Sequence, residues 1–318
     1  MRRISGRREG CRLACALAIA LVVAAPCAAE AQPAPKAWET APAPPPLPDW
    51  RLEGRLAHDG ARIWFAAYGD GPPVILLHGG DASSDAWGFQ VPALVADGHR
   101  VIAIDSRGHG RSTLGDRPLG YELMESDVVA VMDAIGLQHA AVVGWSDGAI
   151  IGLVMAMKDP DRVTRLFAFG ANTDLHGFNP LGAVAPILPK VDALLAQDYA
   201  RISETPDGYR ALAKAVLAMQ LSQPNYRPAD LAAIKGPQIA IADGDHEEFI
   251  LRAHTDYIAR TIPGATLIIL RGVGHFAPLQ APDEFNAAVI GFLDEPVTGP
   301  TPPAEPSAQS GGTSAPSP

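Results

Sequence analysis

The pentapeptide Gly144-Trp145-Ser146-Asp147-Gly148 places a serine where it could act as a nucleophile. A short apolar run, 140–143, precedes the pentapeptide, and an apolar run with helical spacing follows it. Between a strand and a helix, a G-x-S-x-G pattern forms a strained positive-φ turn that lifts the serine hydroxyl clear of the sheet. The flanking glycines have no Cβ to collide with the strand and helix that cross there. A glycine-rich turn with a surface serine would also fit the five residues, but the flanking runs favour a nucleophile.

A base for that serine is expected in the loop Gly272-Val273-Gly274-His275-Phe276, which follows the last apolar run, 266–270. The glycines give the loop the freedom to bring the imidazole of His275 toward Ser146. The other histidines lie in predicted helices, beside acidic residues, or in loops without a suitable strand end. His78 and His109 are interpreted as structural residues of their loops.

The acid that would orient His275 is expected in the stretch 242–248, Ala-Asp-Gly-Asp-His-Glu-Glu. Such an acid holds the imidazole tautomer and stabilises the imidazolium, so Asp or Glu can serve. The stretch offers four carboxylates, and Asp243 follows its strand so closely that it could simply brace the turn. Asp243, Asp245 and Glu247 stay open as candidates at this point. The stretch lacks the spacing of an EF-hand and its central glycine, so no metal site is predicted.

Two backbone amides are expected to stabilise the oxyanion of the reaction. One belongs to Asp147, directly after the nucleophile, and the other to Gly80, in the loop His78-Gly79-Gly80 after the apolar run 74–77. Glycine at position 80 lets the backbone approach the substrate oxygen closely.

The side chains on either side of Ser146 each allow two interpretations. The carboxylate of Asp147 could bond a neighbouring loop amide, or Arg107 or Arg111. It could instead lend the pocket negative charge and favour substrates that bear an amine. Trp145 could pack under the turn or form one wall of an acyl pocket.

The elements that must position these residues alternate between strands and helices, which predicts an α/β fold. Short apolar runs separated by helices of ordinary length indicate βαβ units and a mostly parallel sheet covered on both faces. Such a sheet binds ligands beyond the carboxyl ends of its strands, where the candidate residues lie. The predicted strands are 51–58, 61–68, 74–77, 101–104, 140–143, 163–169, 238–242 and 266–270, and the predicted helices include 84–97, 121–135, 250–262 and 283–293.

The alternation breaks between residues 173 and 235, which are helical in pattern and interrupted by prolines. We expect this segment to be a helical cap over the mouth of the sheet, within a domain of residues 50–295. Residues 32–49 are rich in Ala and Pro and predict an extended linker. Residues 296–318, rich in Pro, Ser, Gly and Thr, predict a disordered tail.

The first 31 residues have the pattern of a secretory signal peptide. Five arginines precede an apolar run, 13–25, that is too short to span a bilayer, and Ala29-Glu30-Ala31 offers a cleavage site. A lipid anchor on Cys27 is the minority alternative, because Pro26 stands where a small, flexible residue is wanted. We expect a periplasmic or secreted protein without membrane attachment after cleavage.

Composition narrows the range of partners. All three cysteines lie in the predicted signal, so a mature chain would contain neither a disulfide nor a cysteine metal site. Cleavage removes five Arg and two Glu and leaves 20 basic against 33 acidic residues, a net charge of −13. An acidic surface argues against nucleic acid and anionic membranes as partners. The class of partner that remains is a small-molecule substrate.

Together these motifs resemble the α/β-hydrolase superfamily over about residues 51–294. The specific pieces are His78-Gly79-Gly80, the run Asp105-Ser106-Arg107-Gly108-His109-Gly110-Arg111-Ser112, the serine pentapeptide and Gly274-His275-Phe276. The serine pentapeptide followed by Gly170-Ala171-Asn172 looks like the biphenyl-hydrolase-like (valacyclovir hydrolase) branch. The resemblance implies a triad of Ser146, His275 and Glu247, with Asp245 as the runner-up acid; Glu247 departs from the usual Asp.

The resemblance also implies hydrolysis of carboxylic esters of small molecules through an acyl-enzyme, with no cofactor. The same triad could serve a lactonase, a carbon–carbon bond hydrolase or a cofactor-free perhydrolase. A dehalogenase is disfavoured, because that chemistry needs a carboxylate at position 146. The alternative outside enzymes is a binding protein that keeps the fold without catalysis, which a misplaced Glu247 would support.

Overall fold

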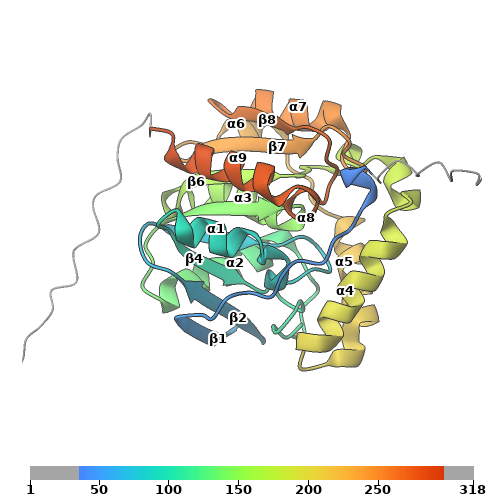
Figure 1. Cartoon of the computed structure of the whole chain (residues 1–318). Coiled ribbons are helices and arrows are strands. Elements are labelled where there is room, and N and C mark those ends of the chain that lie inside the picture. The colour runs from blue at the N-terminus through green and yellow to red at the C-terminus, as the bar shows by residue number, and fades with distance from the viewer. Residues whose placement is uncertain (1–35, 297–318) are drawn as a thin grey trace, which may run out of the picture. The chain divides into compact units, whose positions relative to one another are not determined.

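An eight-stranded sheet forms the centre of this computed structural model, which describes residues 36–296 (Figure 1). Its spatial order is β1-β2-β4-β3-β5-β6-β7-β8; β1–β2 and β2–β4 are antiparallel, and the other neighbours are parallel. The predicted α/β fold with a mostly parallel sheet of about eight strands is confirmed. The strands are β1 (Leu52–His58), β2 (Ala61–Tyr68), β3 (Pro73–Leu77), β4 (Arg100–Ile104), β5 (Ala140–Trp145), β6 (Val163–Phe169), β7 (Gln238–Gly244) and β8 (Thr266–Leu270).

Helices cover both faces of the sheet, because the central parallel strands are apolar on both sides. On one face pack α2 (Tyr121–Ala134), α3 (Asp147–Lys158) and α7 (Arg252–Thr261). On the other pack α1 (Gln90–Ala96) and α9 (Pro282–Asp294). Helix α3 is buried over most of its length, so the turn that precedes it is anchored in the core.

The predicted helix 84–97 is divided in the structure. A 3-10 turn, η2 (Ser84–Trp87), is followed by α1, with Gly88 and Phe89 between them. Pro92 has no N–H to donate to the carbonyl of residue 88, and its ring would clash with that carbonyl in a continuous helix. A further short helix, α8 (Ala277–Gln280), lies between the His275 loop and α9.

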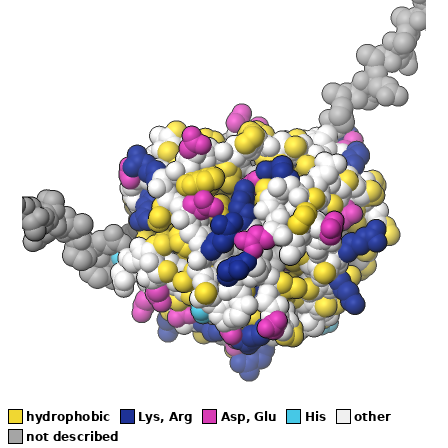
Figure 2. All heavy atoms as spheres, turned by 90° about the horizontal axis from the view of Figure 1, so that it is seen from below, with side chains coloured by type: hydrophobic (Ala, Val, Ile, Leu, Met, Phe, Trp, Pro, Cys, Tyr) yellow, Lys and Arg dark blue, Asp and Glu magenta, His cyan; other side chains and the backbone are white. Residues whose placement is uncertain are grey.

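The edge strand β1 carries alternating exposed and half-buried residues, including charged ones. Arg55 on this strand lies 3.5 Å from Glu204, and Arg117 pairs with Asp59 in the β1–β2 turn. Figure 2 shows this side of the molecule, where Lys and Arg side chains lie beside Asp and Glu. Charges on an edge strand disfavour edge-to-edge pairing with another chain.

Between β6 and β7 the described chain is helical, as the proline-punctuated pattern predicts. Figure 1 shows α4 and α5 beside the end of the sheet toward which the parallel strands point. The elements of this cap are η4 (Leu175–Gly177), η5 (Pro180–Val184), α4 (Leu188–Ile202), η6 (Pro206–Gly208), α5 (Tyr209–Gln220) and α6 (Pro228–Ala232).

Residues 36–49, the described part of the predicted linker, lie against the domain, and we call them the strap. Apart from η1 (Ala37–Glu39), the strap has no regular element. The ring of Trp38 stacks on His246 with centroids 3.5 Å apart, and Gln280 donates a hydrogen bond to the carbonyl of Thr40 (3.1 Å). A Cβ on Gly88 would lie 1.9 Å from the carbonyl oxygen of Pro45, so only glycine admits the strap there.

The predicted signal peptide, 1–31, lies outside the described residues, as does all but the first residue of the predicted tail. In residues 36–296, no helix is both long and apolar enough to cross a membrane.

Candidate active site

Ser146 occupies the sharp turn between β5 and α3. Its backbone has φ 57° and ψ −121°, the positive-φ geometry that the pattern predicts. The glycines around it are required by close approach. A Cβ on Gly148 would lie 2.0 Å from the carbonyl oxygen of Leu77, and a Cβ on Gly144 would lie 2.4 Å from the carbonyl oxygen of Gly148. The crossing of strand and helix therefore holds the serine at the carboxyl end of the sheet.

His275 lies in the loop after β8, with its ring buried. Its Nδ1 lies 2.9 Å from each carboxylate oxygen of Glu247. The ring packs edge-on against Phe249, with centroids 4.9 Å apart, and against Gly170, where a Cβ would lie 2.9 Å from Cε1. Because Nδ1 binds the carboxylate, Nε2 is the nitrogen left to exchange a proton with a nucleophile.

The structure distinguishes the candidate acids by position. The Glu247 side chain is 3% exposed and accepts the N–H groups of Phe249 (2.7 Å) and Ile250 (3.1 Å). Asp245 instead accepts the N–H of Gly272 at 2.7 Å, which braces the loop between β8 and His275. Glu247, and not Asp245, is therefore the carboxylate brought to the imidazole.

Two further carboxyl groups support this arrangement. Asp243 is buried and accepts hydrogen bonds from the Thr255 hydroxyl (2.5 Å) and the Gly244 N–H (3.0 Å), so it braces the end of β7. Glu248 accepts the backbone N–H of His275 at 2.8 Å. Its role in holding the His275 loop has no signal in the sequence beyond its place beside Glu247.

Burial sets the ionisation of the pair. It raises the pKa of Glu247 to about 7 and lowers the pKa of His275 below its ordinary value, because burial penalises each charged form. A lowered imidazole pKa keeps His275 neutral at neutral pH, which is the form a general base needs.

Gly79 and Gly80 bring the loop after β3 against the serine turn. A Cβ on Gly79 would lie 3.1 Å from the Cβ of Ser146, and a Cβ on Gly80 would lie 2.6 Å from Oδ2 of Asp147. Asp147 is the first residue of α3, whose free N–H groups favour negative charge. The two residues predicted to supply oxyanion donors thus lie next to each other beside Ser146.

The side chain of Asp147 is buried, and both of its carboxylate oxygens accept hydrogen bonds. Its Oδ1 accepts the hydroxyl of Tyr121 at 2.8 Å, and Nε2 of Gln220 lies 3.2 and 3.1 Å from its two oxygens. Burial raises its pKa. Tyr121 begins α2 and Gln220 ends α5, so both partners come from segments distant in sequence.

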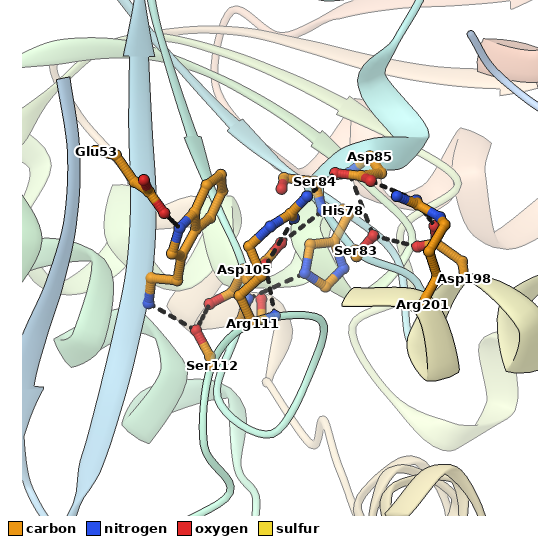
Figure 3. Close-up of polar contacts among 12 residues, drawn as sticks. Glu53, His78, Ser83, Ser84, Asp85, Asp105, Arg111, Ser112, Asp198 and Arg201 are labelled. Carbon is orange, nitrogen blue, oxygen red and sulfur yellow. Dashed lines mark hydrogen bonds and ion pairs between the residues drawn. The ribbon is translucent and has the colours of Figure 1, made fainter. Parts of the chain in front are cut away.

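The expected pairing of Asp147 with Arg107 or Arg111 is wrong. Arg107 is buried and binds both oxygens of Asp127, at 2.9 and 2.6 Å. Arg111 binds Asp85 at 2.7 Å, and its backbone N–H donates to Asp105 (Figure 3). Both arginines are already held by other carboxylates.

Trp145 is packed beside the serine turn, as the first of its two interpretations predicts, and its role as a wall of an acyl pocket stays a prediction. It is 3% exposed, and its indole Nε1 donates to the carbonyl of His275 at 2.7 Å. It packs edge-on against Phe276 and also lines the cavity above Ser146. Trp145 therefore links the serine turn to the His275 loop.

Asp81 is a site residue that the sequence interpretation missed. It follows Gly80 with φ 61°, and its Oδ1 is buried without a hydrogen-bond partner among the described residues. Burial, together with the charges of Asp147 and Asp192, raises its pKa to about 7. An aspartate directly after a histidine–glycine–glycine run could have drawn attention to it.

A cavity of about 170 Å³ lies at the carboxyl end of the sheet. Ser146, His275 and both predicted oxyanion residues line it, and the cap and the loop after β7 close it. The remaining lining residues are Gly79, Asp81, Trp145, Asn172, Phe178, Leu188, Val191, Leu195, Gln220, Phe249, Ile250 and Phe276.

Comparisons with known proteins identify the family to which the chain belongs. A family model described as the alpha/beta hydrolase fold matches residues 72–208. The protein RutD of Caulobacter sp. (strain K31), named as a proposed carbamate hydrolase, is 31% identical over 253 residues, which are 70% of this chain and 91% of RutD. The serine hydrolase BPHL of Homo sapiens is 28% identical over 255 residues, which are 75% of this chain and 85% of BPHL.

Among solved structures, Est816, described as an N-acyl homoserine lactone degrading enzyme, matches with a TM-score of 0.61 and 27% identity. The match covers 75% of this chain and 99% of Est816. The chain belongs to the α/β-hydrolase family and is a hydrolase of that fold. Within the family it is similar to BPHL, as the serine pentapeptide suggested.

Proposed function

We propose that the protein is a serine hydrolase that cleaves carboxylic esters of small molecules through an acyl-enzyme intermediate. The observation that carries the proposal is the pairing of Glu247 with His275 beside the cavity that Ser146 lines. A binding protein without catalysis has no need of a buried carboxylate on Nδ1 of that imidazole. The position of Glu247 therefore favours catalysis.

In the proposed reaction, Nε2 of His275 takes the proton of Ser146 as its oxygen attacks the ester carbonyl. The N–H groups of Gly80 and Asp147 stabilise the resulting oxyanion, and the carboxylate of Glu247 stabilises the imidazolium. His275 then gives the proton to the departing alcohol. Water, deprotonated by the same imidazole, hydrolyses the acyl-enzyme and frees Ser146.

Labelling with a fluorophosphonate and turnover of short p-nitrophenyl esters test the proposal. Wild type is expected to label and to turn over the esters, and Ser146→Ala to do neither. Ser222→Ala, in the turn after α5 and outside the cavity, is the matched control and is expected to behave as wild type. A wild-type protein that neither labels nor hydrolyses any activated ester would favour the binding protein.

Lactone hydrolysis is the second candidate, because the same residues would open a cyclic ester and Est816 is 27% identical to this chain. A panel of open-chain esters and N-acyl homoserine lactones would compare the two. If kcat/KM is higher for the lactones than for the open-chain esters, the preferred substrate is a lactone, and the proposed triad is the same.

We also propose export through the N-terminal segment, on the basis of its arginines, its apolar run and Ala29-Glu30-Ala31. Expression of the full chain in a Gram-negative host and mass measurement of the periplasmic fraction would test it. A mature chain beginning at Gln32 is expected, and an uncleaved chain retained in the cytoplasm would contradict export.

A further inference from the structure

A second and larger cavity, of about 350 Å³, lies next to the active-site cavity. Its outer wall is the strap, through Ala41 and residues 43–46. Its inner walls come from α4, from η2 and from the loop after β8. Its size is in the range of small-molecule sites in proteins.

The two cavities share four lining residues, and all four are apolar: Trp145, Val191, Leu195 and Phe276. Trp145 directly precedes the nucleophile, and Phe276 directly follows the candidate base. The wall common to both cavities is therefore built from the residues nearest to the chemistry. A chain attached to Ser146 that reaches the larger cavity would contact apolar side chains at this common wall.

Part of the lining of the larger cavity is polar, and its charged side chains pair with one another. Ser83 donates to Asp198 of α4 at 2.5 Å, and Asp85 accepts from Arg111 at 2.7 Å and from Arg201 of α4 at 2.5 Å (Figure 3). Because these charges neutralise one another, they leave no free charge to bind an ionic group. The network ties the cap to η2.

We propose that the larger cavity, which we call the strap cavity, is an acyl subsite that takes an unbranched apolar acyl chain of the ester substrate. The inference rests on the proposed esterase function and names its substrate class. The acyl part remains bonded to Ser146 while the alcohol leaves, so a cavity that shares an apolar wall with the site of Ser146 suits the acyl part.

The experiment compares p-nitrophenyl acetate with p-nitrophenyl octanoate. In wild type, kcat/KM is expected to rise with chain length, by up to about fourfold for each methylene that becomes buried. Leu194→Trp places an indole in the strap cavity at a residue that does not line the active-site cavity. It is expected to lower the octanoate-to-acetate ratio of kcat/KM at least tenfold.

Leu217→Trp, at an exposed leucine of α5 that lines neither cavity, is the matched control and is expected to keep the wild-type ratio. Ala41→Phe fills the same cavity from the strap, outside the sheet and its helices, and covers the case in which Leu194→Trp does not fold. Its octanoate-to-acetate ratio is also expected to fall.

Unchanged ratios in both filling variants would overturn the inference. A second result would also overturn it: a loss of activity in the filling variants that grows with alcohol length in a series of acetate esters, because the cavity would then hold the leaving group.

If wild type hydrolyses no ester, the proposed function is refuted, and the subsite is tested on its own by ligand binding. In that case 2-decanone is expected to bind Ser146→Ala more tightly than 2-butanone, and Leu194→Trp should remove the difference; an unaffected difference would overturn the subsite.

Discussion

Replacing Glu247 by glutamine should remove most of the catalytic power while leaving the fold intact. Gln has nearly the same shape, and its amide oxygen can still accept the N–H groups of Phe249 and Ile250, which bind the carboxylate at 2.7 and 3.1 Å. The change therefore deletes a charge and little else. The charge matters when His275 becomes an imidazolium in the transition state.

The size of the effect follows from the 2.9 Å separation of Nδ1 and the carboxylate oxygens. With an effective dielectric constant of about 20, two unit charges at that distance interact by about 6 kcal/mol. Because about 1.4 kcal/mol corresponds to a factor of ten in rate, the expected loss is about 10⁴-fold. Loss of a triad acid in other serine hydrolases is of the same order.

The assay is the second-order rate constant for fluorophosphonate labelling of Ser146, which requires no knowledge of the natural substrate. Asp245→Asn is the matched control, because that carboxylate binds the N–H of Gly272 and not the imidazole. It is expected to label at close to the wild-type rate. A mild effect of Glu247→Gln together with a large effect of Asp245→Asn, in variants with wild-type circular dichroism, would refute the assignment of Glu247 as the acid.

Three further predictions concern the carboxylates and glycines around the nucleophile. Burial raises the pKa of Asp81 to about 7, so between about pH 4 and pH 7 the folded protein keeps a proton on Asp81 that the unfolded chain has lost. The folded state therefore loses stability as pH rises through this range. Asp81→Asn should raise Tm relative to wild type more at pH 8 than at pH 5. If the carboxylate of Asp147 recognises a substrate amine, Asp147→Asn should lower kcat/KM for aminoacyl esters at least about tenfold more than for neutral esters, whereas equal losses would exclude the idea. Gly148→Ala should lower the free energy of unfolding, measured in urea, by about 4 kcal/mol or more, because its Cβ would lie 2.0 Å from a carbonyl oxygen. The control is Gly291→Ala on α9, where a Cβ meets open space, and it should raise the free energy of unfolding by up to about 1 kcal/mol.

The strands and the serine turn could be predicted because their signals are local. The central parallel strands are apolar runs bounded by turn residues, and the serine pentapeptide lies between such a run and an apolar helix. His275 was identified on similar grounds, from a glycine-rich loop after the last strand. These features depend on residues within a few positions of one another.

The remaining features depend on contacts between distant segments. The choice between Asp245 and Glu247 is decided by the path of the loop, in which Asp245 turns away to bind Gly272. The partners of Asp147 lie 26 residues before it and 73 residues after it, so nothing beside it in sequence indicates them.

The strap was interpreted as a linker because its composition is that of an extended, proline-rich chain. Composition describes what a segment can do alone. It does not show that Trp38 will stack on His246, or that Gly88 leaves room for the backbone of Pro45.

The attachment of the strap has a practical consequence for work on this protein. Gln280 donates to Thr40 in the strap and accepts the N–H of Gly274, the residue before His275. The family match begins only at residue 72 and the first strand at Leu52. A recombinant fragment trimmed to either boundary would still contain every residue of the proposed triad. It would lack one wall of the larger cavity and one support of the histidine loop, so its substrate preferences should not be taken as those of the whole chain.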